Sequence, residues 1–172
     1  EYLPAALEQA RVVIGEVNPA IPWTHGGVHL QARDFALLID AEHPPLEQGR
    51  AAPGPVEQAI ARHVAALIED GATLQLGIGN LPEAVLAALH GHRDLGLHSG
   101  AVGDGIAALA EAGVLTNAKK SLDTGMGIGG ILMGSEKVRR WAHRNPQFAL
   151  RGTNYTHDPE VLAASHQLAA IN

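Results

Sequence analysis

Short apolar runs alternate with segments of helical periodicity along most of the chain, and glycine or proline separates one from the next. Apolar runs rich in β-branched residues predict strands, and apolar residues spaced three or four apart predict helices. The strands are predicted at residues 11–17, 34–40, 73–76, 95–98, 130–133, 148–151 and 168–171. The helices are predicted at residues 56–70, 82–90, 105–112, 136–143 and 159–164. This alternation is typical of an α/β fold with a mostly parallel sheet and flanking helices.

A predicted linker divides the chain, and a predicted helix follows it. Residues 43–55 are rich in proline and glycine, which predicts a linker and a candidate domain boundary. In the helix that follows, Gly71 is expected to end the helix in a left-handed conformation. The apolar residues on the face expected to enter the core are Val56, Ile60, Val64, Leu67 and Ile68.

Composition indicates a folded globular protein and argues against nucleic-acid and membrane partners. The chain is 46% hydrophobic and 17% charged, which fits a folded globular protein, and only 3% aromatic, which predicts an aliphatic core. The net charge of −6 with scattered Lys and Arg argues against a nucleic-acid partner. No apolar run approaches the ~20 residues that span a bilayer, so we expect no membrane partner and a cytoplasmic location. Because the chain begins at Glu1 and its last residues form an apolar run, we expect an internal part of a longer protein.

The strongest local signal is the junction between the strand at 73–76 and the next helix. Gly77 and Gly79 allow the backbone to approach a ligand, and a helix N-terminus attracts anions. Asn80 is expected to cap the helix, with Glu83 at capping-box spacing. Pro82 stands where a Rossmann motif has its third glycine, so dinucleotide binding is not indicated. Spacing alone leaves a tight turn that binds nothing as an equal alternative.

The histidines and lysines give weaker signals. None of the ten histidines has the spacing of a metal site, so no metal is expected. His98 ends a predicted strand beside the glycine loop, where a packing or orienting role is expected. Lys119 and Lys120 are expected at the surface.

An ordered set of motifs covers nearly the whole chain. The motifs are Glu-Val-Asn-Pro-Ala-Ile-Pro at 16–22 with Thr-His-Gly at 24–26, then residues 70–75, 77–82, 94–99, 104–105, 112–117, 145–146, 154–159 and 170–172. In this order they resemble the acetyl-CoA hydrolase/transferase family, which includes the 4-hydroxybutyrate CoA-transferases.

The resemblance implies two related α/β domains of the CoA-transferase-like (NagB/RpiA-like) type. Residues 1–42 would end the N-terminal domain, 43–55 would form the linker, and 56–172 would begin the C-terminal domain. Members move CoA between a short-chain acyl-CoA and a carboxylate, or hydrolyse the thioester. A glutamate attacks the thioester and forms a glutamyl-CoA intermediate. A homo-oligomer is implied, with acyl-CoA as substrate and no permanently bound cofactor.

The resemblance also implies site residues. The loop along the CoA site corresponds to Gly77, Ile78, Gly79, Asn80, Leu81 and Pro82. The substrate-binding residues correspond to His25, Gly26, His98, Ser99 and Gly100.

Two positions depart from the family pattern. The nucleophilic glutamate follows a His-Thr or His-Ser pair, and Gly100 stands at that position here. Asp104 is no replacement, because members with the glutamate also carry it, so no catalytic residue is assigned. Trp23 stands where the family has arginine.

Three interpretations stay open. The chain is part of a CoA-transferase or acyl-CoA hydrolase that draws a carboxylate from elsewhere, for example from the Ser-Ala-Ile-Glu-Val-Asp-Leu stretch that follows Ile-Asn in the family. Alternatively, it is a non-catalytic CoA-binding remnant. A third, weaker interpretation is a purely structural α/β domain.

Overall fold

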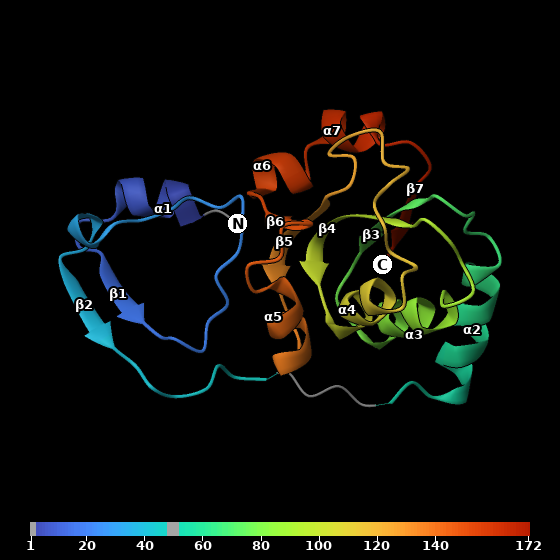
Figure 1. Ribbon diagram of the computed structural model, residues 1–172, viewed down its shortest axis with the longest axis horizontal. Helices are drawn as coiled ribbons and strands as arrows, with labels where there is room; N and C mark the ends of the chain where they lie inside the picture. Colours follow the sequence, from blue (N-terminus) through green and yellow to red (C-terminus); the bar gives the residue numbers. More distant parts are fainter. Residues whose placement is uncertain (1–2, 48–51) are drawn as a thin grey trace.

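The computed structural model describes residues 3–47 and 52–172 (Figure 1). The helices are α1 (Leu3–Gln9), α2 (Pro55–Ala65), α3 (Asn80–Ala88), α4 (Asp104–Glu111), α5 (Glu136–Ala142), α6 (Thr153–Thr156) and α7 (Pro159–Ala164), with a short 3-10 helix at Ala32–Asp34. The strands are β1 (Ile14–Val17), β2 (Leu37–Asp40), β3 (Thr73–Leu76), β4 (Gly96–Val102), β5 (Gly127–Leu132), β6 (Phe148–Leu150) and β7 (Leu168–Ile171).

The larger of the two sheets formed by the described residues is five-stranded and parallel throughout, in the order β6-β5-β4-β3-β7. From β3 the chain steps to β4, β5 and β6 in one direction, and then returns across the sheet to place β7 on the other side of β3. The α/β fold with a mostly parallel sheet is therefore confirmed.

Helices cover both faces of this sheet. Helices α3, α4 and α5 pack side by side on one face, and α2 packs beside α3. The return from β6 to β7 carries α6 and α7 over the opposite face, where α6 contacts β4 and β5. Figure 1 shows the two helical layers on opposite sides of the sheet.

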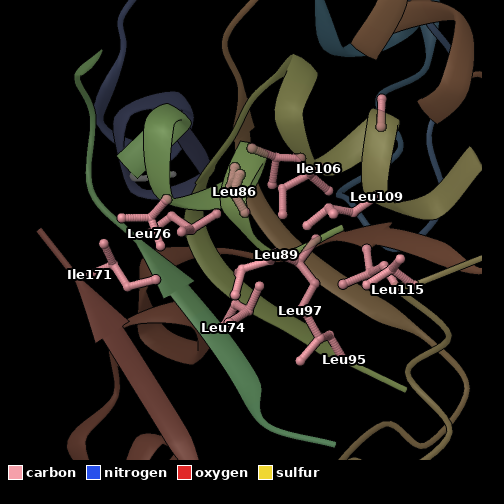
Figure 2. Packing of buried hydrophobic residues seen from close by; sticks show 14 of the residues in the cluster. Leu74, Leu76, Leu86, Leu89, Leu95, Leu97, Ile106, Leu109, Leu115 and Ile171 are labelled. Carbon is pink, nitrogen blue, oxygen red and sulfur yellow. The ribbon is translucent and has the colours of Figure 1, made fainter. Parts of the chain in front are cut away.

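The core is aliphatic, as the composition predicts. Leucine and isoleucine side chains from β3, α3, β4, α4 and β7 gather in one buried cluster (Figure 2). Leu74, Leu97 and Ile106 are fully buried. Phe148 and Trp141 add an aromatic contact at one end, with ring centroids 4.8 Å apart.

The helix predicted at 56–70 differs from α2 in length and in its buried face. It ends at Ala65, and Gly71 takes its positive φ of 85° in the following turn instead of at a helix cap. Ala61 and Ala65 are the buried residues of α2. Of the five residues expected in the core, Val64 packs against it and Ile68 is buried, whereas Val56, Ile60 and Leu67 are exposed. Small alanine side chains let α2 pack closely on α3, and His92 Nε2 contacts the carbonyl oxygens of Ala65 and Ile68 at the helix end.

The N-terminal strands β1 and β2 form a separate two-stranded parallel sheet. Parallel sheets are normally covered on both faces. Here Ile14, Leu37 and Ile39 are 59%, 52% and 50% exposed, so the described residues leave this sheet uncovered. The predicted domain boundary stays a prediction, and residues 48–51 of the predicted linker lie outside the described residues.

Some boundaries differ from the predictions. β4 continues through Ser99 and Gly100 to Val102, and β5 begins at Gly127, three residues before the predicted start. Helices α1 and α6 were not predicted. Within the described part of the chain, no helix is both long and apolar enough to cross a bilayer.

The packing at Leu97 gives a stability prediction. Leu97→Ala removes a fully buried side chain from the core cluster and should lower the free energy of unfolding by about 3 kcal/mol. Urea denaturation followed by circular dichroism measures it. The matched control, Leu67→Ala, changes a side chain that is 82% exposed, and equal losses in the two variants would contradict the described core.

Candidate functional site

Strands β3 and β4 separate toward their carboxyl ends. Their ladder contains only the pairs Thr73–Gly96 and Leu74–Leu97, although β4 runs on for five more residues. The Ser99 hydroxyl bridges the gap: its oxygen accepts from the Leu76 N–H at 3.0 Å, and its proton is within reach of the carbonyl oxygens of Leu76 and Ala101. Ser99 is fully buried, so the structure gives it a connecting role.

The parted strands open into a pocket of about 430 Å³. Its lining comes from the carboxyl ends of β3, β4 and β7, from β5, and from the segment after α6: Gln75, Leu76, Gly77, Ile78, Gly100, Ala101, Ile131, His157 and Asn172. Ligands of open parallel sheets bind at this edge. None of these described lining residues is Asp or Glu.

The glycine loop forms one wall of the pocket. The Gly77 N–H donates to the carbonyl oxygen of Ile171 at 2.7 Å, which ties the loop to β7. Gly79 has φ 146° and ψ 180°, a conformation essentially confined to glycine. Gly79 occupies the N-cap position and Asn80 is the first helical residue, so the expected cap by Asn80 was wrong.

The start of α3 is fixed to its neighbour. The Glu83 carboxylate accepts a hydrogen bond from the Gly105 N–H at 3.1 Å, at the start of α4. Pro82 is buried in the first turn, while Ile78 is 61% exposed at the pocket. Loop residues 77–79 therefore have a fixed backbone and an accessible surface.

The opposite wall contains Gly100 and His157. Gly100 is buried in β4, and the imidazole of His157 lies over it. A Cβ placed on Gly100 would be 2.6 Å from His157 Nε2 and still nearer to Cε1. The ring therefore fills the space in which a side chain at position 100 would begin.

His98 lies two residues before Gly100 on β4 and is fully buried. Its Nε2 is 3.3 Å from the carbonyl oxygen of Tyr155, and its buried Nδ1 has no hydrogen-bond partner among the described residues. Burial lowers the pKa of His98, and the charge of Lys120 acts in the same direction. A neutral, enclosed imidazole fits the expected packing or orienting role.

Lys120 is buried, so its expected surface position was wrong. Its Nζ donates to the carbonyl oxygen of Met126 at 2.6 Å. Burial lowers the pKa of Lys120 to about 8, against the opposing effect of the Asp123 carboxylate. The same carboxylate accepts from the Tyr155 hydroxyl at 2.6 Å, a bond that raises the pKa of Tyr155.

His25 and Gly26 lie at the β6 edge of the sheet, outside the lining of the pocket. The His25 carbonyl oxygen accepts from the Leu150 N–H at 2.8 Å, and that of Gly26 from Arg151 Nη1 at 2.9 Å. Trp23, the residue at the family's arginine position, stacks on His29 with ring centroids 5.5 Å apart. The structure thus brings residues 77–78 and 100 together, but not residues 25–26.

A second pocket of about 410 Å³ lies between the N-terminal segment and the end of β5. Ile21, Thr24 and Leu46 line one side, and Met133 and Arg139 the other. Ile131 lines both this pocket and the first, so the two are neighbours. Among the described residues, no group of three or more His, Cys, Asp or Glu side chains could hold a metal ion.

Comparison with curated proteins finds CoA-transferases. The chain is 40% identical over 172 residues to the 4-hydroxybutyrate coenzyme A transferase of Clostridium kluyveri, covering 100% of this chain and 40% of that protein. It is 30% identical over 171 residues to the succinyl-CoA:cyclohexane-1-carboxylate CoA transferase of Geobacter metallireducens, covering 99% and 39%. The chain thus spans about two fifths of these relatives. No family model matches it.

Comparison with solved structures also finds a CoA-transferase. The 4-hydroxybutyrate CoA-transferase from Porphyromonas gingivalis superposes with a TM-score of 0.90 at 33% identity, over 100% of this chain and 44% of that one. RipA from Yersinia pestis superposes with a TM-score of 0.94 at 29% identity, over 100% and 40%.

Lys120 gives a testable pH dependence. Its pKa falls from 10.5 to about 8 on folding, so the unfolded chain holds more protons between these values. The free energy of unfolding should therefore rise as the pH increases from 8 to 10.5, by about 3 kcal/mol from this group. Denaturation of Lys120→Met should show a flatter pH profile than the wild type. Lys119→Met, at an exposed position, is the control, and an unchanged profile in Lys120→Met would refute the assignment.

Proposed function

Because this chain is a homologue, over its whole length, of 4-hydroxybutyrate CoA-transferase and related CoA-transferases, we propose that it is part of an enzyme that acts on short-chain acyl-CoA. The proposed reaction class is acyl exchange on CoA, either to a carboxylate or to water. The proposed enzyme is a homo-oligomer, as the family resemblance implies.

The observation that carries the proposal is the pocket between β3 and β4. It combines the glycine loop with the wall at position 100, the two features that the family resemblance assigns to CoA and to the reacting group. Gly77, Ile78, Gly79, Asn80, Leu81 and Pro82 are the proposed CoA-binding residues. The N-terminus of α3 offers backbone N–H groups and a positive dipole end to a thioester oxygen or a phosphate.

The remaining proposed site residues lie in two places, on β4 and beside the second pocket. His98, Ser99 and Gly100 form the strand on which the acyl group would rest, with Ser99 holding that strand to β3. His25 and Gly26 adjoin Thr24, which lines the second pocket. Since Ile131 borders both pockets, a long substrate such as an acyl-CoA could extend from one to the other.

The alternative is a CoA-binding remnant without activity. The observation in its favour is Gly100, which leaves the expected nucleophile position without a carboxylate, and the described lining supplies none. Consumption of butyryl-CoA separates the alternatives: it gives acetyl-CoA when acetate accepts the CoA and free CoA when water is the acceptor, whereas a remnant binds CoA and converts nothing.

The loop conformation predicts the effect of one substitution on binding. Gly79→Ala forces a residue with a Cβ into a glycine-only conformation, so the loop must move. We expect at least a tenfold weaker affinity for CoA, about 1.4 kcal/mol, measured by isothermal titration calorimetry.

The control for this prediction is Gly91→Ala, at a glycine with open space around its Cβ position. This variant should bind CoA like the wild type. Equal affinities in the Gly79 and Gly91 variants would remove the loop from the proposed site.

A further inference from the structure

His157 stands where the pocket would otherwise present a side chain from position 100. We propose that His157 is the catalytic base of this pocket and activates water for hydrolysis of the acyl-CoA thioester. The inference rests on the proposed function, because it needs an acyl-CoA in the pocket. It goes beyond that function by naming the reacting group and choosing water as the acyl acceptor.

The first step is steric. The ring can lie against β4 only because Gly100 has no Cβ, since such an atom would be 2.6 Å from Nε2. Any side chain at position 100 would therefore displace the imidazole. The two residues are complementary: the glycine removes one candidate reacting group and admits another.

The second step concerns the protonation of the ring. Thr156 is buried, and its Oγ1 lies 2.9 Å from His157 Nδ1 and 3.4 Å from the carbonyl oxygen of Gly152, to which it donates. In the tautomer with Nδ1 protonated, the ring donates to Oγ1 and the single hydroxyl proton remains with Gly152. Nε2 then carries a lone pair, the form that a general base requires.

The third step is the reaction. Nε2 takes a proton from a water molecule, and the water oxygen attacks the thioester carbonyl carbon. The C–S bond breaks, and the CoA thiolate takes the proton from the imidazolium. The acid leaves as a carboxylate and a proton, so one water is consumed and no other reactant is needed. Imidazole suits both transfers because its nitrogen can accept a proton and then return it.

Among the described lining residues, His157 is the side chain suited to this role. The lining contains no Asp or Glu, and its other polar side chains, Gln75 and Asn172, are amides that do not act as bases. Ser99 is fully buried with its hydroxyl bonded to backbone groups of β3 and β4, and burial lowers the pKa of His98.

The test uses the protein purified from its source cells and its variants, with butyryl-CoA as the probe. CoA release is followed with a thiol reagent in the absence of any carboxylate acceptor. His157→Gln should lower kcat at least 100-fold, with the affinity for CoA unchanged within about twofold. The matched control His90→Gln replaces an exposed histidine and should leave kcat unchanged.

A second variant separates chemistry from folding. Gly100→Ala keeps the imidazole but displaces it, so it should lower kcat as well. The double variant Gly100→Ala/His157→Gln should be no slower than His157→Gln alone, because both changes remove the same group.

The outcomes are distinct. A His157→Gln variant with wild-type kcat overturns the inference, and so does a wild type that converts butyryl-CoA to acetyl-CoA when acetate is present and releases no free CoA. The same is true of a wild type that binds CoA but consumes no butyryl-CoA with or without acetate, which would favour the remnant. A wild type that neither binds CoA nor releases it overturns the proposed function as well.

Discussion

The hydroxyl of Ser99 is the contact on which the pocket depends. Where β3 and β4 no longer pair, the N–H of Leu76 would be buried without a partner, a cost of about 1–3 kcal/mol. The Ser99 oxygen accepts from this N–H, and it lies 3.2 Å and 2.7 Å from the carbonyl oxygens of Leu76 and Ala101, to which its one proton can be donated, so the strands can diverge while their amino ends stay in register. The opening is thus a built feature of the sheet, and the glycine loop and position 100 face each other because of it.

Small residues set how closely the layers approach this opening. Ala61 and Ala65 bring α2 against α3, and Gly129 lies within β5, where a Cβ would collide with Val102 and Phe148. Such close approaches suit a chain with few aromatic residues, because an aliphatic core fills its volume by bringing backbones together. In the same way, the absence of a side chain at Gly100 leaves room for the imidazole of His157.

Periodicity predicted the sheet and most of its helices because parallel strands are continuous apolar runs with helices between them. It failed where burial overrides local preference. Ser99 and Gly100 are weak strand residues, yet both lie inside β4, and the glycines of β5 form a strand because neighbouring strands supply their hydrogen bonds. On the helix predicted at 56–70 the expected face was partly wrong: Val64 and Ile68 do meet the core, but Val56 and Ile60 are exposed, and alanines fill the contact with α3.

The candidate site could be predicted only where its residues are close in sequence. The loop at 77–82 follows its strand directly. It could therefore be predicted from three adjacent signals: the strand, the glycines and the start of the next helix. His157 is 57 positions from Gly100, and its ring is placed by α6, a four-residue helix with no periodic signal. Lys120 likewise became buried through contacts with Met126 that its Lys-Lys sequence does not indicate. A motif that lacks its expected reactive side chain can therefore still have a reactive group at that place in the structure. In a fold whose return crossover lies over the same strand, a second segment can fill the place, and only the three-dimensional structure shows which segment does so.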